Sequence, residues 1–384
     1  MKTSLLASIV GIVLFHASTA VAYVHQHCND QNVKWSSNSK TLRASSVSFP
    51  SGGTWWGGIE DAIDRFNENP SKFSYALAVD SGGVGRGNGT SELWFSSDED
   101  VLACDDDGTG CAPAIAYPYT TCYEWREWTL FGGWSDWETV SHVDEVDVAF
   151  NADRDWTVST NTSRLMKYDG SERSIQATAL HEIGHGARFK HEDDEYNIMG
   201  KDFEHLHVNS STARAYLGED VSDGLVHLYG TSSQNKEDLA VVHWRYEGPD
   251  DGYSDHAKTE VSSSTGGTLS TTTVNGEKTY KVNAGDTVKV KFTYENNGAN
   301  TQSAVQVGFY VSTNNLITTW DTRLGGATMT LGRNDVYTTE NTVSLPSTLT
   351  SGEYYWLGAI IDENDTLSEE VEWNNATYLP IKIK

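Results

Sequence analysis

Basic residues are scarce in this chain. Lys and Arg together number 27 against 54 Asp and Glu over 384 residues, which gives a formal net charge of −27. A surface of this sign repels phosphate groups, so we exclude nucleic acid and anionic membrane surfaces as partners. The acidity favours solubility and the attraction of cations, but it does not indicate a substrate.

Long hydrophobic runs are also lacking, apart from one at the N-terminus. Lys2 precedes an apolar run from Leu5 to Phe15, and small residues at 20–22 end it. The run is shorter than the roughly 20 residues that cross a bilayer, and no second run follows, so we expect no membrane span. The pattern is typical of a signal peptide over residues 1–22 and predicts a secreted, extracellular protein.

Cysteine is rare, and its four residues are Cys28, Cys104, Cys111 and Cys122. An even number in an exported chain favours two disulfides, for which three pairings exist. Of these we favour Cys104 with Cys111 and Cys28 with Cys122.

The most informative motif is HEIGHGARFKH at residues 181–191. His181 and His185 are one helical turn apart, so on a helix both side chains point the same way and can share a metal ion. Glu182 follows the first histidine, where it can reach a water molecule instead of the metal. His191 supplies a third imidazole if the helix ends before it and the chain turns back. Three protein ligands leave one position open, which is typical of a catalytic zinc site.

This motif, followed by Met199 in the run YNIMG, resembles the metzincin zinc peptidases, in which a methionine turn lies under the metal. The run GEDVSDGLVHLYG at 218–230 resembles the closing helix of matrixin-type domains. The run EVDVAFN at 145–151 is similar to a strand that precedes the active-site helix. The resemblance covers about residues 30–230 and implies a mixed twisted sheet with active-site helices.

The resemblance also implies the site residues. They are the zinc ligands His181, His185 and His191, the general base Glu182 and the turn methionine Met199. It further implies that a substrate lies extended along an edge strand, which we expect near Ala114–Tyr119. The reaction would be peptide hydrolysis by zinc-activated water without a covalent intermediate.

Three positions bear on this resemblance. Arg188 stands where the clan usually has glycine, so either Gly186 takes over the turn or Arg188 bears a strain of about 1 to 2 kcal/mol. Lys201 replaces the tyrosine of astacins and serralysins, so no tyrosine switch is assigned. Cys28 lacks the proline, arginine and glycine that surround the inhibitory cysteine of matrixin propeptides, and we do not expect it to cap the metal.

Helical and strand patterns support this organisation. Apolar residues at helical spacing predict a helix over 54–70, and strands are expected at 33–49, 91–95 and 112–118. Ser174 is expected to cap the active-site helix, whose apolar face would be Ile175, Ala179 and Ile183.

From Asp238 onward the pattern changes to short alternating strands, among them 287–294, 304–311 and 353–361. They predict an antiparallel β-sandwich. The runs GDTVKVKFTYENNG and EEVEWNN resemble the immunoglobulin-like CARDB adhesion domain. Its ending, Glu369–Asn375, would either bind a cation or form a hydrogen-bonded loop network.

The sequence therefore predicts an α+β chain with a signal peptide at 1–22, a matrixin-like zinc peptidase domain at 23–232 and a CARDB-like sandwich at 238–384. We expect a secreted zinc endopeptidase acting on protein or peptide substrates, with a sandwich that binds a cell-surface or matrix ligand. The alternative is an inactive adhesion or binding protein on a metzincin scaffold. Deletion after Thr231 should spare hydrolysis of a short peptide. The oligomeric state is open.

Three further clusters have competing interpretations. Seven aromatic residues either grip substrate or, as we favour, pack under an insertion: Tyr117, Tyr119, Tyr123, Trp125, Trp128, Trp134 and Trp137. The acidic residues of segment 98–107 are candidates for Ca²⁺, without EF-hand spacing. The pairs His25 and His27, and His205 and His207, are expected to be surface imidazoles rather than metal ligands.

Overall fold

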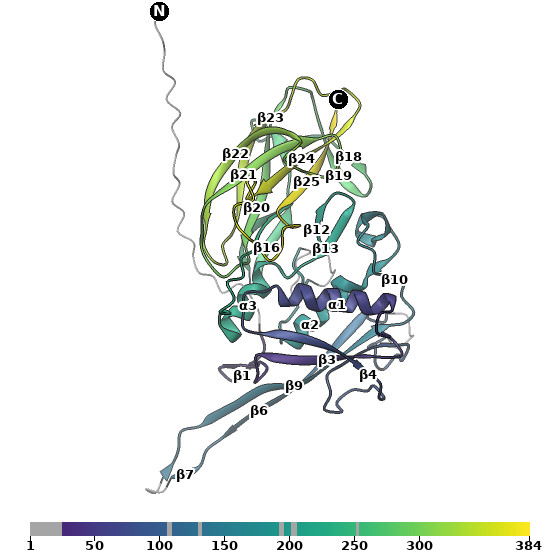
Figure 1. The fold of residues 1–384 in the computed structure, drawn as a ribbon, viewed down its shortest axis with the longest axis vertical. Helices are drawn as coiled ribbons and strands as arrows, with labels where there is room; N and C mark the ends of the chain where they lie inside the picture. Colours follow the sequence, from purple (N-terminus) through teal and green to yellow (C-terminus); the bar gives the residue numbers. More distant parts are fainter. Residues whose placement is uncertain (1–24, 106–109, 130–132, 192–195, 201–205, 251–252) are drawn as a thin grey trace, which may run out of the picture.

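The computed structural model describes residues 25–105, 110–129, 133–191, 196–200, 206–250 and 253–384. An N-terminal α+β part and a C-terminal all-β part are stacked along the long axis of the molecule (Figure 1). The predicted α+β class is confirmed, with strands in the majority and few helices. Among the described residues, no helix is long and apolar enough to cross a membrane.

A five-stranded mixed sheet forms the base of the N-terminal part. Its strands, in spatial order, are β4 (Ser74–Asp80), β3 (Ser39–Ser45), β5 (Glu92–Ser96), β9 (Glu138–Asn151) and β6 (Ala114–Trp125). The first four are parallel to one another, and β6 pairs antiparallel with β9. The last seven residues of strand β9, EVDVAFN, are all buried, including Glu145 and Asp147.

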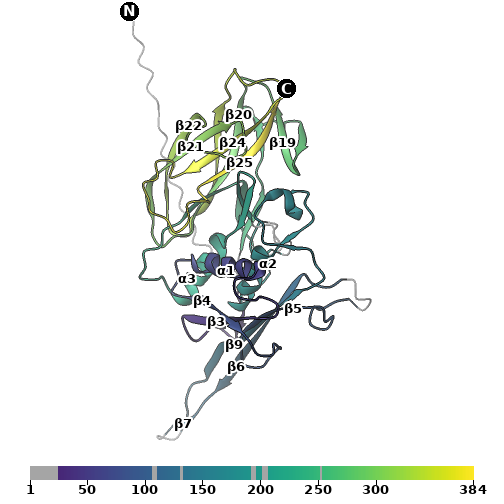
Figure 2. The same cartoon turned by 45° about the vertical axis from the view of Figure 1, so that its right-hand side comes forward.

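Three helices lie between this sheet and the C-terminal part (Figures 1 and 2). They are α1 (Thr54–Asn67), α2 (Ile175–Gly186) and α3 (Gly218–Tyr229). Helix α1 crosses α2 closely, because a Cβ at Gly58 would lie 2.4 Å from Cγ2 of Ile175. The predicted helix in segment 54–70 is confirmed as α1. Gly58 allows the two helices to approach each other this closely.

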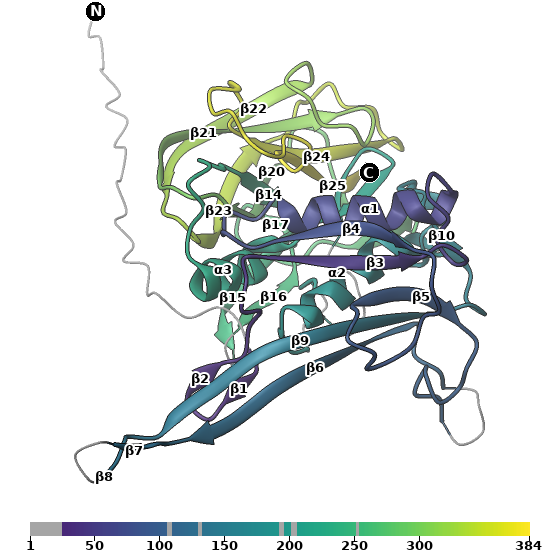
Figure 3. The same cartoon turned by 60° about the horizontal axis from the view of Figure 1, so that its bottom comes forward.

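Strands β6 and β9 continue beyond the sheet as a long two-stranded arm (Figure 3). Two short strands, β7 (Trp128–Thr129) and β8 (Gly133–Trp134), pair near its tip. The hairpin β1 (His27–Cys28) and β2 (Gln31–Asn32) is tied to the arm by the disulfide Cys28–Cys122. The second disulfide is Cys104–Cys111, so both predicted pairings are confirmed.

Shorter elements connect the sheet to the helices. They are β10 (Trp156–Thr157), β11 (Arg173–Ser174), β12 (Leu206–Asn209), β13 (Thr212–Ala215) and the 3₁₀ helices η1 (Thr162–Arg164) and η2 (Met166–Tyr168).

The C-terminal part is a sandwich of two sheets. One contains β14 (Leu239–Val242), β17 (Val261–Ser263), β20 (Thr287–Asn296) and β23 (Val336–Ser344). The other contains, in spatial order, β18 (Thr271–Val274), β19 (Glu277–Val282), β25 (Ala376–Ile383), β24 (Tyr354–Ile361), β21 (Gln302–Ser312) and β22 (Thr322–Leu331). Alternate residues from both sheets fill the core, for example Val290, Phe292 and Leu357. A separate hairpin, β15 (Trp244–Asp250) and β16 (Tyr253–Lys258), lies at the start of this part.

The two parts share a hydrophobic core. Tyr253, Ile317 and Tyr378 from the C-terminal part belong to the same buried cluster as Phe66 and Leu180 from the N-terminal part. Apolar contact is therefore continuous across the predicted boundary at 232–238.

Candidate metal centre

Helix α2 carries the first two histidines on a rigid support. It begins after Ser174, whose side chain accepts a hydrogen bond from Ala177 N at 3.2 Å, as predicted for an N-cap. Ile175, Ala179 and Ile183 are each at most 1% exposed. Because this apolar face is buried, the ligand side chains have a fixed backbone.

The structure brings the three predicted histidines together. One ring nitrogen from each of His181, His185 and His191 lies within 4.8 Å of the others. The Nε2 atoms of His181 and His185 are 3.0 Å apart. Zn–N bonds of about 2.0–2.1 Å place tetrahedral ligand nitrogens roughly 3.4 Å from one another, which is close to the His181–His185 separation, and His191 lies near enough to be the third ligand of the same ion.

The other ring nitrogens fix the orientation of two of these imidazoles. His181 Nδ1 donates to Ile198 O at 2.6 Å, and His185 Nδ1 donates to Phe189 O at 2.7 Å. A proton on Nδ1 leaves the Nε2 lone pair free for a metal. Burial, together with the neighbouring imidazoles, lowers the pKa of His185 to about 4 and that of His181 well below its usual value. Both rings are therefore in the neutral form that binds zinc.

Glu182 lies beside the edge strand of the sheet. Its side chain is 3% exposed, and its carboxylate accepts a hydrogen bond from the backbone N–H of Ala116 in β6. Burial raises the pKa of Glu182 to about 8. Among the described strands β6 pairs with β9 alone, so the predicted edge strand at Ala114–Tyr119 is confirmed as an edge.

Met199 packs under the ligand helix. It is fully buried, and a Cβ at Gly184 would lie 2.5 Å from its sulfur. Gly184 lies between the two histidines of α2, so the methionine approaches the helix at the turn that carries both imidazoles. The role of Met199 as a turn methionine stays a prediction.

The chain leaves α2 through a left-handed residue. Gly186 is still helical, and Arg188 has a φ of 73°, so Arg188 itself bears the strain. The N-terminal segment holds this turn, because His25 Nε2 donates to Ala187 O at 3.0 Å and Gln26 N donates to Arg188 O at 3.1 Å.

Two of the expected surface imidazoles are instead buried. His25 and His207 are each 2% exposed, and His207 Nε2 donates to Val241 O at 3.1 Å. The expectation was wrong for both because each imidazole is buried against a backbone carbonyl that is distant in sequence, and local sequence does not indicate such a partner. His27 is exposed, and His205 lies outside the described residues, as does Lys201.

Several arm aromatics are open to solvent. Tyr123, Trp125 and Trp137 are 52%, 40% and 59% exposed, so the expected packing beneath an insertion is wrong for them. Tyr117 is half-buried, and its hydroxyl donates to Val101 O at 2.6 Å. The side chains of Trp128 and Trp134 lie outside the described set.

The predicted calcium loop is described in part. The carboxylate of Asp98 accepts a hydrogen bond from Asp100 N at 2.9 Å, so it takes part in a local turn. Residues 106–109 lie outside the described ranges. Cys28 is in a disulfide, so it is not a thiolate near the metal centre.

One feature beside the edge strand was missed. Glu145 and Asp147 on β9 are 4% and 0% exposed, and they accept hydrogen bonds from the backbone of Gly87, Asn88 and Gly89. The loop that follows β4 is thereby held against β9, and its Gly87 lies next to the ring of Tyr119 in β6. The signal in the sequence is a glycine-rich loop with a single apolar residue, Val84, so most of its backbone N–H groups need polar partners.

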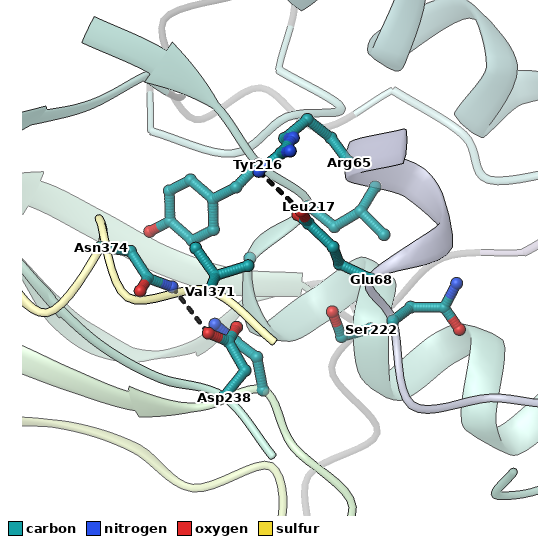
Figure 4. Close-up of a pocket in the computed structure, with 11 residues that line it drawn as sticks. Arg65, Glu68, Tyr216, Leu217, Ser222, Asp238, Val371 and Asn374 are labelled. Atoms are coloured by element: carbon teal, nitrogen blue, oxygen red, sulfur yellow. Dashed lines mark hydrogen bonds and ion pairs between the residues drawn. The ribbon is translucent and has the colours of Figure 1, made fainter. Parts of the chain in front are cut away.

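A cavity lined mostly by polar residues lies at the junction of the two parts (Figure 4). Glu68 is paired with Arg65 at 2.6 Å, and Asp238 accepts a hydrogen bond from Asn374 Nδ2 at 2.9 Å. Nearby, Asn375 Nδ2 donates to Glu369 at 2.7 Å. Of the two interpretations of segment Glu369–Asn375, these contacts support the hydrogen-bonded loop network.

The comparisons with known proteins concern the C-terminal part. No curated protein matches this chain. A crystal structure of a CARDB domain from Pyrococcus furiosus in complex with di-metal ions has 15% identity and a TM-score of 0.25, and it covers 40% of this chain and 95% of its own. A solution NMR structure of that domain has 17% identity and a TM-score of 0.24, with 39% and 97% covered. The CARDB family model matches residues 269–378. The metzincin resemblance stays a prediction, whereas the C-terminal part of this chain contains an immunoglobulin-like CARDB domain.

Proposed function

We propose that this protein is a secreted zinc-dependent endopeptidase. The observation that carries the proposal is the convergence of His181, His185 and His191 next to a buried carboxylate that faces an edge strand. Two disulfides support an oxidising compartment such as the extracellular space.

A bound zinc ion would polarise the scissile carbonyl group and make water more acidic. The chain supplies the other parts of the reaction. Glu182 accepts the proton of the attacking water and delivers it to the leaving amine. Its raised pKa makes Glu182 a stronger base for the proton of water, and the positive charge of a nearby zinc ion would keep it ionised before that proton arrives.

Strand β6 is the surface on which we place the substrate. An extended peptide can pair with its free edge through backbone hydrogen bonds, which require no particular side chains. Because Ala116 bonds to Glu182, a peptide paired near this residue has a backbone carbonyl close to the general base. The glycine-rich loop held by Glu145 and Asp147 borders the same strand.

The test is incubation of the purified protein with a peptide library, with and without a chelator, and identification of cleavage sites by mass. We expect cleavage that the chelator abolishes and zinc restores. Replacing Glu182 with Gln should leave stoichiometric zinc bound and lower kcat by at least about a hundredfold, because the general base is lost. Normal cleavage by the Gln variant would refute the role of Glu182.

A second candidate function is binding without catalysis. The CARDB domain favours it, since an adhesion module can account for secretion by itself. Binding to a cell-surface or matrix ligand together with no cleavage of any library peptide by the zinc-loaded wild type would support this alternative.

A further inference from the structure

Neither the third histidine nor Met199 lies on a helix. Helix α2 ends at Gly186, five residues before His191, and residues 196–199 around Met199 are turns or bends. A ligand in a loop binds metal weakly unless neighbouring groups hold the loop in place, because binding would otherwise remove its conformational freedom. The contacts that hold this loop therefore matter to any metal bound there.

We propose that the hairpin β15–β16 is a positioning element of the metal centre, through Tyr253 and Ser254. The proposal rests on the proposed zinc function. It assigns to residues outside the predicted peptidase domain, 23–232, the task of holding the segment that carries His191 and Met199.

The first contact is at the third histidine. The hydroxyl of Tyr253 donates to the carbonyl of Lys190 at 2.7 Å, one residue before His191. Tyr253 is 1% exposed and belongs to the hydrophobic cluster that the two parts share. Its aromatic ring is thus fixed, and its hydroxyl holds the backbone from which His191 projects.

The second contact reaches the methionine turn through two intermediates. Ser254 donates from N and from Oγ to the carboxylate of Asp220 in α3, at 3.1 and 2.9 Å. Asn197 Nδ2 donates to the same carboxylate, and Asn197 Oδ1 accepts from Met199 N at 2.9 Å. All four side chains are buried, so water does not compete for these bonds.

A third contact involves Tyr196, the residue before Asn197. The ring of Trp244, the first residue of β15, stacks on Tyr196 with centroids 5.6 Å apart. On its other side the hairpin is tied to the sandwich, since Tyr246 N donates to Thr338 Oγ1 at 2.7 Å and Thr293 Oγ1 donates to Trp244 O at 2.6 Å. The hairpin therefore connects the CARDB part to the metal loop.

The experiment compares two tyrosines in the full chain. Tyr253→Phe removes the hydroxyl that binds Lys190 O. The matched control is Tyr280→Phe, because Tyr280 is also buried and donates to a backbone carbonyl, Thr259 O at 3.2 Å, inside the sandwich. For both variants we would measure the zinc dissociation constant by chelator competition, the urea midpoint of the zinc-free protein, and kcat and KM.

We expect Tyr253→Phe to raise the zinc dissociation constant about tenfold and to lower kcat at saturating zinc with KM unchanged. Tyr280→Phe should shift the urea midpoint by a similar amount and leave zinc affinity unchanged. Equal zinc affinities in the two variants would overturn the proposal. Ser254→Ala provides a second variant if Tyr253→Phe does not fold, with the same expectation.

The zinc measurement separates this proposal from the proposed function. If the wild type binds zinc tightly but cleaves nothing, the peptidase function fails while the affinity difference still decides the role of the hairpin. If the wild type binds no zinc, both proposals are wrong.

Discussion

At the scale of the residue, a few positions adopt backbone conformations that do not occur in a right-handed helix. Arg188 is the clearest case, since its φ of 73° lies in the left-handed region and its carbonyl binds Gln26 N. The turn therefore places His191 without glycine, at the cost of strain in the arginine.

Substitution of Arg188 can measure this strain. Alanine retains the left-handed penalty of about 1–2 kcal/mol, whereas glycine removes it and loses about 0.5–1 kcal/mol through its freer unfolded chain. We expect Arg188→Gly to be more stable than Arg188→Ala by about 0.5–1 kcal/mol in urea unfolding of the zinc-free protein. Equal stability would show that the turn relaxes in the variants.

At the scale of the element, the β6–β9 arm extends the strand on which we place the substrate. Its base is fixed by the disulfide Cys28–Cys122, and the hydroxyl of Ser141 donates to Asn32 O at 3.1 Å. Tyr123 and Trp125 therefore lie on a supported strand that continues the proposed substrate edge. Exposed aromatic residues at such a position are suited to contact a bound chain.

A peptide-length series tests the arm. If a long substrate continues along β6, Trp125→Ala should lower kcat/KM about fivefold for long peptides, through loss of an aromatic contact worth about 1 kcal/mol. It should leave short peptides unaffected. The matched control is Trp320→Ala, because Trp320 is 95% exposed on the sandwich. An equal effect of both variants, or no dependence on length, would contradict this role.

At the scale of the whole molecule, acidic groups are buried or half-buried where the two parts meet. Burial raises the pKa of Asp238 to about 7, and that of Glu68 and Glu369 to about 8, and neighbouring carboxylates add to these shifts. Arg65 pairs with Glu68 and lowers the shift there. The junction is thus more favourable when these groups are protonated.

Stability should accordingly depend on pH. In the unfolded chain these groups titrate near pH 4. Their contribution to the free energy of unfolding is therefore fully present below pH 4 and is lost as the pH rises to about 8. We expect the free energy of unfolding of the zinc-free protein to fall by about 2 kcal/mol or more between pH 5 and pH 8.5.

Asp238→Asn should flatten this pH dependence, because the amide stays neutral and keeps an oxygen for Asn374. Asp155→Asn, at an exposed position, is the control and should not change the slope. An unchanged slope in Asp238→Asn would mean that Asp238 does not titrate with folding.

Much of the fold and of the candidate site could be predicted because the signals are local. The spacing of His181, Glu182 and His185 follows from helix geometry, and Ser174 caps that helix through a bond three residues away. Strand alternation predicts the sandwich in the same way. Each depends on residues that are near one another in the chain.

The sequence by itself thus determined that three histidines and a glutamate have the spacing of a metal site, and that the pattern changes to short alternating strands after residue 238. Only the tertiary structure decided that β6 continues into an exposed arm, that His25 and His207 are buried, and that Tyr253 holds the loop before His191. These features depend on contacts between residues separated by tens to more than a hundred positions. No local spacing encodes such contacts, because they exist only after the strands and helices have packed.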